Sequence, residues 1–262
     1  MLTSIRNERV QAVRRLHRRS ARLAERRFVV EGPQAVREAL DCLLELYTTD
    51  LAHPLAVQAG ARGVEVVHVD AKVLQSLGQT VTPQAVLGVA PLLAATLPAS
   101  PRLVVVLHEV SDPGNAGTVI RTADAAGADA VALTGDSVDP YNGKCVRATA
   151  GSLWHLPVVS GQPLEEVVAE LRRTGVQVLA ASGAGQDDLF DLAEAGALAR
   201  PTAWVLGAEA HGLPAAALDA ADRRVRIPLL GRAESLNLAT AAAICLYASA
   251  RAQRAAGATG LE

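Results

Sequence analysis

Residues 103–133 read LVVVLHEVSDPGNAGTVIRTADAAGADAVAL, and this stretch decides the fold class. It begins with an apolar run at 103–107, continues through turn-forming residues and a helical pattern, and ends in a second apolar run at 129–133. Short apolar runs without alternation are typical of strands that are buried on both faces of a parallel sheet. The stretch therefore predicts a strand, a helix and a second, parallel strand.

The same alternation continues toward the C-terminus and predicts an open α/β sheet with right-handed crossovers. In such a sheet, ligands bind at the carboxyl ends of the strands, so the loops that follow the apolar runs are the candidate sites. Further strands are expected at 156–159, 176–180, 203–206 and 225–229, and helices at 117–126, 142–150, 164–173, 214–221 and 238–255.

The N-terminal third has a different texture and predicts a smaller α/β domain. Strands are expected at 28–30, 64–69 and 86–89, and helices at 34–46 and 71–77, the first of them entered through Pro33. A proline-rich stretch at 91–101 is typical of a linker. We therefore expect two domains, residues 1–97 and residues 98–262.

Length and composition agree with two folded domains. The chain has 262 residues, of which 50% are hydrophobic and 20% charged, so it can bury a core and is not a disordered chain.

The uncharged stretches at 73–101 and 235–250 are too broken or too short to span a bilayer. The N-terminus is basic without a following apolar stretch, which argues against a signal peptide. Three widely spaced cysteines and histidines without metal spacing predict neither a disulfide framework nor a metal site. We expect a soluble cytoplasmic protein.

The charge is unevenly distributed. Residues 1–27 hold nine arginines against two glutamates, a net charge of +7, which leaves −9 for the rest because the whole chain carries −2. Such a segment favours an anionic partner, most simply nucleic acid, although a membrane surface or a merely solvated basic helix would also suit it. Val10, Val13 and Leu16 give the segment one apolar edge if it is helical.

Three loops after predicted strands hold candidate site residues, and each also has a purely structural interpretation. In the first, Asn115 could cap a helix and leave Arg121 merely exposed. In the second, two glycines around Glu209 could serve a strand-to-helix turn, and His211 is more typical of a loop histidine than of a ligand. In the third, Ser235 could cap the apolar helix that follows. The glycines at 183 and 185 lack the spacing of a nicotinamide site, and no P-loop, HExxH or GxSxG motif is present.

The three loops contain, in order, Asp112-Pro-Gly-Asn115-x-Gly117-x-x-x-Arg121-Thr-Ala, Leu206-Gly207-x-Glu209-x-x-Gly212-Leu and Ile227-Pro-x-x-Gly231-x-x-x-Ser235-Leu-Asn237. Taken together, they resemble the three motifs of the SpoU (TrmH-type) RNA 2′-O-ribose methyltransferases. Residues 139–151 are similar to the segment between the first two motifs of that family. Residues 1–97 more loosely resemble the substrate-binding domain of its ribosomal RNA members.

The resemblance implies a parallel-sheet domain whose C-terminal part is tied in a deep trefoil knot, and a homodimer. It implies S-adenosylmethionine as cofactor, a ribose 2′-hydroxyl as methyl acceptor, and ribosomal RNA, most simply 23S RNA, as substrate. A transfer RNA methyltransferase, a catalytically silent RNA-binding protein and a small-molecule methyltransferase remain alternatives. The cofactor is expected to bind mostly through main-chain groups of Leu206, Gly207, Ile227, Leu229 and Leu236.

The same resemblance assigns catalytic roles. Arg121 matches the arginine that is often named as general base, but a guanidinium is effectively always protonated, so stabilising an alkoxide or gripping a phosphate is the role we expect. Asn115, Ser235 and Asn237 would orient the ribose, and Glu209 would position Arg121. Gly114 and Gly143 depart from the usual histidine and proline of the family. The side chains expected to bind RNA are Arg14, Arg15, Arg18, Arg19, Lys144 and Arg147.

Overall fold

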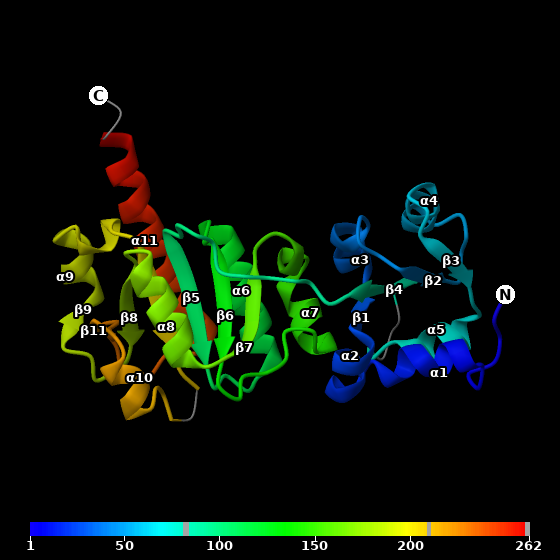
Figure 1. Ribbon diagram of the computed structural model, residues 1–262, viewed down its shortest axis with the longest axis horizontal. Helices are drawn as coiled ribbons and strands as arrows, with labels where there is room; N and C mark the ends of the chain where they lie inside the picture. Colours follow the sequence, from blue (N-terminus) through cyan, green and yellow to red (C-terminus); the bar gives the residue numbers. More distant parts are fainter. Residues whose placement is uncertain (81–83, 209–210, 260–262) are drawn as a thin grey trace. The chain divides into compact units, whose positions relative to one another are not determined.

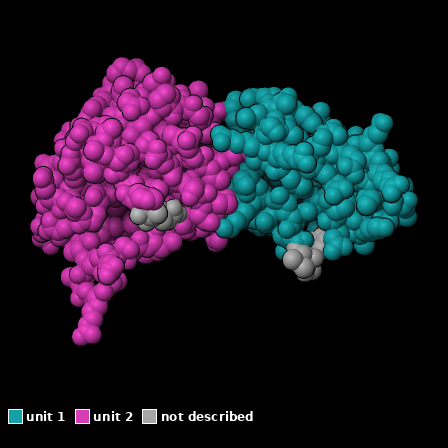
Figure 2. Space-filling model, turned by 90° about the horizontal axis from the view of Figure 1, so that it is seen from below, with its two compact units in different colours: residues 1–94, 141–154 teal, residues 95–140, 155–262 magenta. Residues whose placement is uncertain are grey.

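The computed structural model describes residues 1–80, 84–208 and 211–259 (Figure 1). The chain forms two compact units, which Figure 2 distinguishes by colour. The N-terminal unit comprises Met1–Ala94 and Tyr141–Trp154, and the C-terminal unit comprises Ala95–Pro140 and His155–Glu262. The first division falls inside the proline-rich stretch, close to the expected boundary. Residues 141–154, however, pack with the N-terminal unit although they lie far beyond that boundary.

A mixed four-stranded sheet forms the centre of the N-terminal unit within the described residues, in the order β1-β4-β2-β3. Strand β4 is antiparallel to both β1 and β2, whereas β2 and β3 are parallel. The strands are β1 (Arg27–Glu31), β2 (Glu45–Thr48), β3 (Glu65–His68) and β4 (Val86–Pro91). The helices of this unit are α1 (Glu8–Arg15), α2 (Arg19–Glu25), α3 (Pro33–Ala39), α4 (Pro54–Ala61), α5 (Ala71–Leu77), α7 (Gly143–Thr149) and the short 3-10 helix η1 (Ser152–Trp154).

The helix expected at 34–46 is too long, and this prediction is wrong at its C-terminal end. Helix α3 begins at Pro33 as expected but stops at Ala39, and β2 begins at Glu45. The backbone N–H of Leu44 donates to the carbonyl of Val89, which commits the chain to the sheet. Apolar periodicity over so short a stretch does not distinguish a buried strand from a helix, because tertiary pairing decides between them.

The arginine-rich segment is folded into the N-terminal unit as α1 and α2. Val10, Val13 and Leu16 are buried in its core, which confirms the apolar edge. Arg22 is only 4% exposed and donates to the carbonyls of Leu16 and His17. Arg9 donates to the carboxylates of Glu45 and Glu65. These two arginines therefore contribute to the fold of the unit, and Arg27 lies 3.6 Å from the same Glu45 carboxylate.

Helix α7 and η1 are fixed to β1 by aromatic contacts and an ion pair. The ring of Phe28 lies 4.7 Å from that of Tyr141 and 6.1 Å from that of Trp154, measured between centroids. The Glu31 carboxylate, 7% exposed, accepts a 2.7 Å hydrogen bond from Nη1 of Arg147. A buried carboxylate is tolerated only when it is paired in this way. Residues 141–154 are thus an integral part of the N-terminal unit.

The C-terminal unit contains a parallel sheet that has seven strands in the described part of the chain, in the order β7-β6-β5-β10-β8-β11-β9. Helix α8 packs on the face that carries Val104 and Val106, and α11 packs on α6, β5 and β10 (Figure 1). This confirms the expected α/β class. The strands are β5 (Leu103–His108), β6 (Ala130–Thr134), β7 (Val158–Gln162), β8 (Gln177–Ala181), β9 (Asp187–Asp188), β10 (Thr202–Leu206) and β11 (Arg223–Arg226). The helices are α6 (Pro113–Ala126), α8 (Leu164–Arg173), α9 (Leu189–Glu194), η2 (Ala197–Ala199), α10 (Ala215–Asp219) and α11 (Leu238–Thr259).

Two differences from the expected elements matter for the site. Strand β11 ends at Arg226, three residues before the predicted end, so the main chain of residues 227–229 makes no sheet pairing in the described structure. Strand β9 and helix α9 were not predicted, because the strand is only two aspartates long and the helix only six residues. Helix α11 is anchored to the sheet by the buried Trp204, whose Nε1 donates to the Ser249 hydroxyl at 2.9 Å.

The ion pair of Glu31 should make stability depend on acid pH. Burial alone would raise the pKa of Glu31, but hydrogen bonds from the Thr80 hydroxyl and the Gln79 and Thr80 amides, together with Arg147, hold it below its ordinary value. A lowered pKa contributes stability above the unfolded value of about 4.3, and that stability is lost as the pH falls below it. We expect Glu31→Gln to cost about 1–3 kcal/mol in the free energy of unfolding at neutral pH.

Denaturant unfolding at pH values from neutral to about 3 would measure this effect. The Glu31→Gln variant should lose less stability on acidification than the wild type. Glu166→Gln, which removes an exposed carboxylate of α8, is the matched control. Parallel losses in the wild type and in Glu31→Gln would contradict a stabilising role of the ionised Glu31.

Candidate cofactor and catalytic site

A pocket of about 220 Å³ lies at the carboxyl ends of β8, β10 and β11, which are neighbours in the sheet. Its walls come from the segments that follow these strands and from the start of α11. This is the edge at which an open parallel sheet binds its ligands. The lining is mostly small or apolar, and its polar side chains are those of Ser182, Glu234 and Ser235.

Gly207 allows the backbone to fold back on itself at the end of β10. The N–H of Gly212 donates to the carbonyl of Ala208 at 2.9 Å. A β-carbon on Gly207 would overlap the Gly212 carbonyl and come within 2.6 Å of the Leu213 nitrogen. Gly212 itself has a φ of +65°, which favours glycine. The second glycine-containing loop therefore does serve a tight turn, and that turn forms a wall of the pocket.

The loop after β8 contributes to the same pocket, and the sequence analysis did not select it as a site. Ser182 and Gly183 line the pocket beside Ala181. A β-carbon on Gly185 would lie 2.6 Å from the backbone nitrogen of Arg226, so this glycine lets the loop approach β11 closely. The absent GxGxxG spacing excluded only a nicotinamide site. Two glycines directly after a buried strand were the signal for a close backbone approach.

All five residues expected to hold the cofactor line this single pocket, although they come from two separate segments. Leu206 is buried and Leu229 is 40% exposed. That they bind a cofactor stays a prediction, but the structure brings them together around one cavity. The five are Leu206, Gly207, Ile227, Leu229 and Leu236.

Two of the expected catalytic residues meet across the fold. The Asn237 side-chain nitrogen donates to the Asn115 side-chain oxygen at 3.2 Å. The Asn237 oxygen also accepts from the backbone N–H groups of Ala239 and Thr240, so Asn237 caps α11. The structure thus assigns this cap to Asn237 and not to Ser235, which lines the pocket and is exposed.

Helix α6 is not capped by Asn115, which was the purely structural interpretation of that residue. Asp112 is the N-cap residue, and its carboxylate accepts from the Asn115 backbone N–H at 2.8 Å. Helix α6 consequently begins at Pro113, four residues before the predicted start. This leaves the Asn115 side chain directed at Asn237 and not at its own helix terminus.

Arg121 is exposed on α6 and makes no hydrogen bond or ion pair with the residues that the structure describes. A permanently charged guanidinium that has no partner among the described residues is a candidate to bind an anionic ligand. Glu209, the residue expected to position Arg121, lies outside the described residues. Its contact with Arg121 therefore stays a prediction.

The residues expected to bind RNA lie in the N-terminal unit. Arg14, Arg15, Arg18 and Arg19 are all exposed, and Arg15 lies 3.8 Å from Glu25. On α7, Lys144 is exposed, whereas Arg147 is partly occupied by its ion pair with Glu31. Of the nine arginines in residues 1–27, Arg9 and Arg22 make hydrogen bonds within the fold, and Arg15 and Arg27 lie within ion-pair distance of Glu25 and Glu45.

Within residues 1–80, 84–208 and 211–259, no group of three or more His, Cys, Asp or Glu side chains is placed to hold a metal ion. No helix among these residues is both long and apolar enough to cross a membrane.

The described structure is an open parallel α/β sheet with a pocket at the carboxyl ends of its strands and a hydrogen-bonded pair, Asn115 and Asn237, and it is preceded by a domain that carries an arginine-rich segment. The model of the SpoU rRNA methylase family matches residues 102–247, and that of the MRM3-like substrate-binding domain matches residues 7–88. The chain belongs to the SpoU rRNA methylase family.

Individual relatives cover nearly the whole chain. The 23S rRNA (guanosine(2553)-2′-O)-methyltransferase RlmP of Bacillus subtilis is 34% identical over 94% of this chain and 97% of its own. The AdoMet-bound rRNA methyltransferase of Sinorhizobium meliloti is similar in structure, with a TM-score of 0.83 and 35% identity over 95% of this chain and 97% of its own. The methyltransferase AviRb of Streptomyces viridochromogenes, in complex with AdoMet, has a TM-score of 0.85 and 30% identity over 95% of this chain and 99% of its own.

Substitution of Gly207 tests how the pocket is built. We expect Gly207→Ala to reduce the affinity for S-adenosylmethionine at least tenfold and to cost about 1–3 kcal/mol of stability, because its β-carbon collides with the backbone of residues 212–213. Calorimetric titration and thermal unfolding would measure the two effects. Gly183→Ala is the matched control, since Gly183 lines the same pocket but a β-carbon there meets nothing within 4 Å. Equal affinities in the two variants would contradict this account of the turn.

Proposed function

We propose that this protein transfers a methyl group from S-adenosylmethionine to a ribose 2′-hydroxyl of ribosomal RNA, most simply 23S RNA. The observation that carries the proposal is the pocket at β8, β10 and β11, in which all five expected cofactor residues lie. Family membership and the 23S rRNA names of RlmP and RlmB relatives support the substrate class. The AdoMet-bound relatives support the cofactor.

The pocket fits a cofactor that is recognised through the main chain. Gly207 forms a cradle that any β-carbon would fill, and this leaves its backbone accessible from the pocket. Leu206, Ile227, Leu229 and Leu236 add apolar walls. Bound there, S-adenosylmethionine would supply an electrophilic methyl group on its sulfonium.

The protein's task in the chemistry is to orient the ribose and to handle the charge that develops on the 2′-oxygen. A hydroxyl is a poor nucleophile, so alignment and stabilisation of the alkoxide supply much of the rate. The Asn115–Asn237 pair and the Ser235 hydroxyl offer donors and acceptors to the ribose. Arg121 cannot take the proton, because its guanidinium stays charged, but it can bind the adjacent phosphate or the developing oxyanion. Glu209 would fix its direction.

The N-terminal unit is proposed to recognise the RNA. The match to a substrate-binding domain and the exposed Arg14, Arg15, Arg18 and Arg19 support this role. Each exposed arginine can neutralise a phosphate, which makes RNA affinity dependent on salt. Residues 1–97 and 98–262 would then divide recognition from methyl transfer, with residues 141–154 assigned structurally to recognition.

The resemblance also implies a knot, a homodimer and a cytoplasmic location, and we include all three in the proposal. The strand order supports the knot, because β11 lies between β8 and β9, which both precede it, and the chain then returns to pack α11 on α6. Tyr247 on α11 is 53% exposed beside α6, a surface that a second copy could cover. Sedimentation should give a dimer, and a monomer at micromolar concentration would contradict it.

Methyl transfer from labelled S-adenosylmethionine tests the function. Ribosomal RNA from a strain that lacks the gene should accept label as a 2′-O-methylnucleoside, whereas ribosomal RNA from the parent strain and transfer RNA should not. Label in transfer RNA alone would move the substrate to the alternative class. Absence of label from both RNAs, in a protein that binds the cofactor, would favour a silent RNA-binding protein.

The role of Arg121 can be tested by substitution. We expect Arg121→Ala to keep cofactor affinity but to lose about 10²–10³ in turnover, the scale of removing one preorganised donor. Arg121→Lys should rescue little, because a point charge does not reproduce the guanidinium fork. Arg173→Ala, which removes an exposed arginine of α8, is the control. Single-turnover methyl transfer would measure the rates, and a Lys variant close to wild type would show that charge alone suffices.

A further inference from the structure

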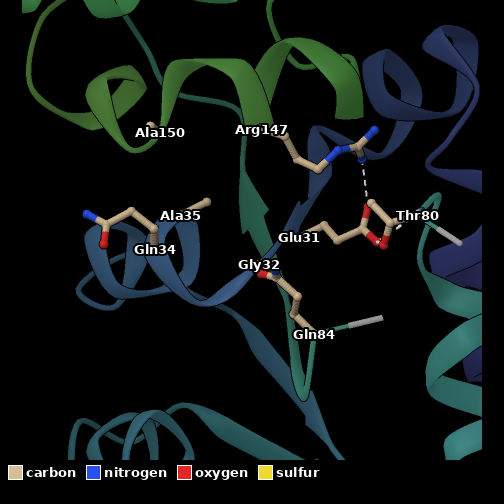
Figure 3. A pocket seen from close by; sticks show the side chains of 8 residues that line it. All are labelled: Glu31, Gly32, Gln34, Ala35, Thr80, Gln84, Arg147 and Ala150. Carbon is tan, nitrogen blue, oxygen red and sulfur yellow. Dashed lines mark hydrogen bonds and ion pairs between the residues drawn. The ribbon is translucent and has the colours of Figure 1, made fainter. Parts of the chain in front are cut away.

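A second pocket of about 220 Å³ lies in the N-terminal unit, apart from the residues assigned to methyl transfer (Figure 3). Its walls come from the end of β1, the turn into α3 and the first residues of that helix, from Thr80 and from Gln84, which precedes β4, and from helix α7 with its C-cap residue. Every wall residue belongs to the unit that is proposed to recognise RNA. The pocket is therefore a candidate for direct contact with the substrate.

Two polar side chains at this pocket keep hydrogen-bonding capacity. Arg147 uses Nη1 for Glu31, while its Nη2 and Nε bond to none of the described residues. The side-chain amide of Gln84 likewise makes no hydrogen bond within the described part of the chain. A β-carbon on Gly32, whose φ is +100°, would lie 3.1 Å from Oε1 of Gln84, so glycine keeps this corner open. The pocket thus presents both donors and an acceptor.

The charge balance of the pocket argues against a phosphate as its ligand. The Arg147 guanidinium is neutralised by the buried Glu31 carboxylate, which also accepts from the Gln79 and Thr80 amides. What remains is a neutral, polar cavity with apolar patches from Ala35 and Ala150. Nucleobases have this complementary character, because each base edge combines donors and acceptors in a flat apolar ring.

Positive charge that can bind phosphates is available near Glu31, in the turn between α1 and α2 and the start of α2. A smaller cavity is lined by Glu31 together with Leu16, His17 and Arg22, so the turn between α1 and α2 lies close to this glutamate. The exposed Arg18 and Arg19 belong to that segment. One RNA strand could therefore place phosphates on these arginines and an unstacked base in the pocket.

We propose that the pocket formed by Gly32, Gln84, Arg147 and Ala150 binds an unstacked nucleobase of the substrate RNA, at a nucleotide other than the one that is methylated. This inference rests on the proposed function for the identity of the RNA. Sequence-specific RNA recognition typically uses such splayed-out bases of loops and bulges. Glu31 acts as a positioning residue, since it holds Arg147 and touches no RNA itself.

The direct test uses the full chain and the four nucleoside 5′-monophosphates, with ribose 5-phosphate as a probe that lacks a base. Backbone amide spectra should show saturable shifts at Gly32, Gln84 and Ala150 with at least one nucleotide, with a dissociation constant of about 1 mM, the scale for so small a contact. Ribose 5-phosphate should leave these amides unchanged. No shift with any nucleotide, or equal shifts with ribose 5-phosphate, would overturn the proposal.

Substitutions separate the pocket from general folding effects. Gln84→Leu should weaken nucleotide binding about tenfold, because it removes one polar contact while the Glu31–Arg147 pair stays in place. Gln58→Leu is the control, because it removes an exposed glutamine of α4 that does not line the pocket, and this variant should bind nucleotides as the wild type does. Equal weakening in both variants would contradict the assignment.

Methyl transfer to ribosomal RNA distinguishes this inference from the proposed function. Gln84→Leu should raise KM for the RNA while kcat stays near wild type, because the residue contributes to binding and not to the reacting atoms. Base binding without any methyl transfer by the wild type would refute the proposed function and leave the pocket assigned. Methyl transfer without base binding would refute the pocket alone.

Discussion

The close backbone approach at Gly207 is the constraint on which the C-terminal unit depends. Because no β-carbon fits between Gly207 and residues 212–213, the chain can turn back at the end of β10 and leave its main chain facing a pocket. Gly185 permits a similar approach to β11. Two glycines, neither of which offers a side chain to a ligand, thereby shape the surface that we propose to bind the cofactor.

The start of α11 joins this pocket to the side chains that we propose as catalytic. Asn237 caps the helix and bonds Asn115 at the start of α6, so one residue fixes both a helix terminus and a pair of polar groups. Trp204 and Ser249 hold the helix to β10 further along. The groups that we propose to orient the ribose are consequently positioned by helices, as catalysis by alignment requires.

The N-terminal unit is more than an appended domain, because residues 141–154 leave the methyltransferase sheet between β6 and β7 to complete it. The chain therefore passes between the two units three times. Removal of residues 1–97 would strip Tyr141, Arg147 and Trp154 of their partners Phe28 and Glu31. A shortened protein would expose these groups, which makes substitutions in the full chain the cleaner probes of recognition.

Periodicity predicted the parallel sheet, because continuous apolar runs such as 103–107 and 176–180 have few other uses in a folded domain. The motif residues around Gly207 and Ile227 were predictable through their resemblance to a family, and the structure places them around one cavity. The docking of residues 141–154 was not predictable, since it depends on Phe28 and Glu31 more than a hundred residues away. Nor was the cap by Asn237, because Ser235 has an equally good capping side chain.

Hydrogen–deuterium exchange with and without S-adenosylhomocysteine tests the central claim, that the main chain around β8, β10 and β11 forms the cofactor site. The claim predicts slower exchange on binding in residues 181–186, 205–213 and 225–238, with little change in the N-terminal unit. Binding with unchanged exchange in these three segments, or with protection confined to other elements, would contradict it.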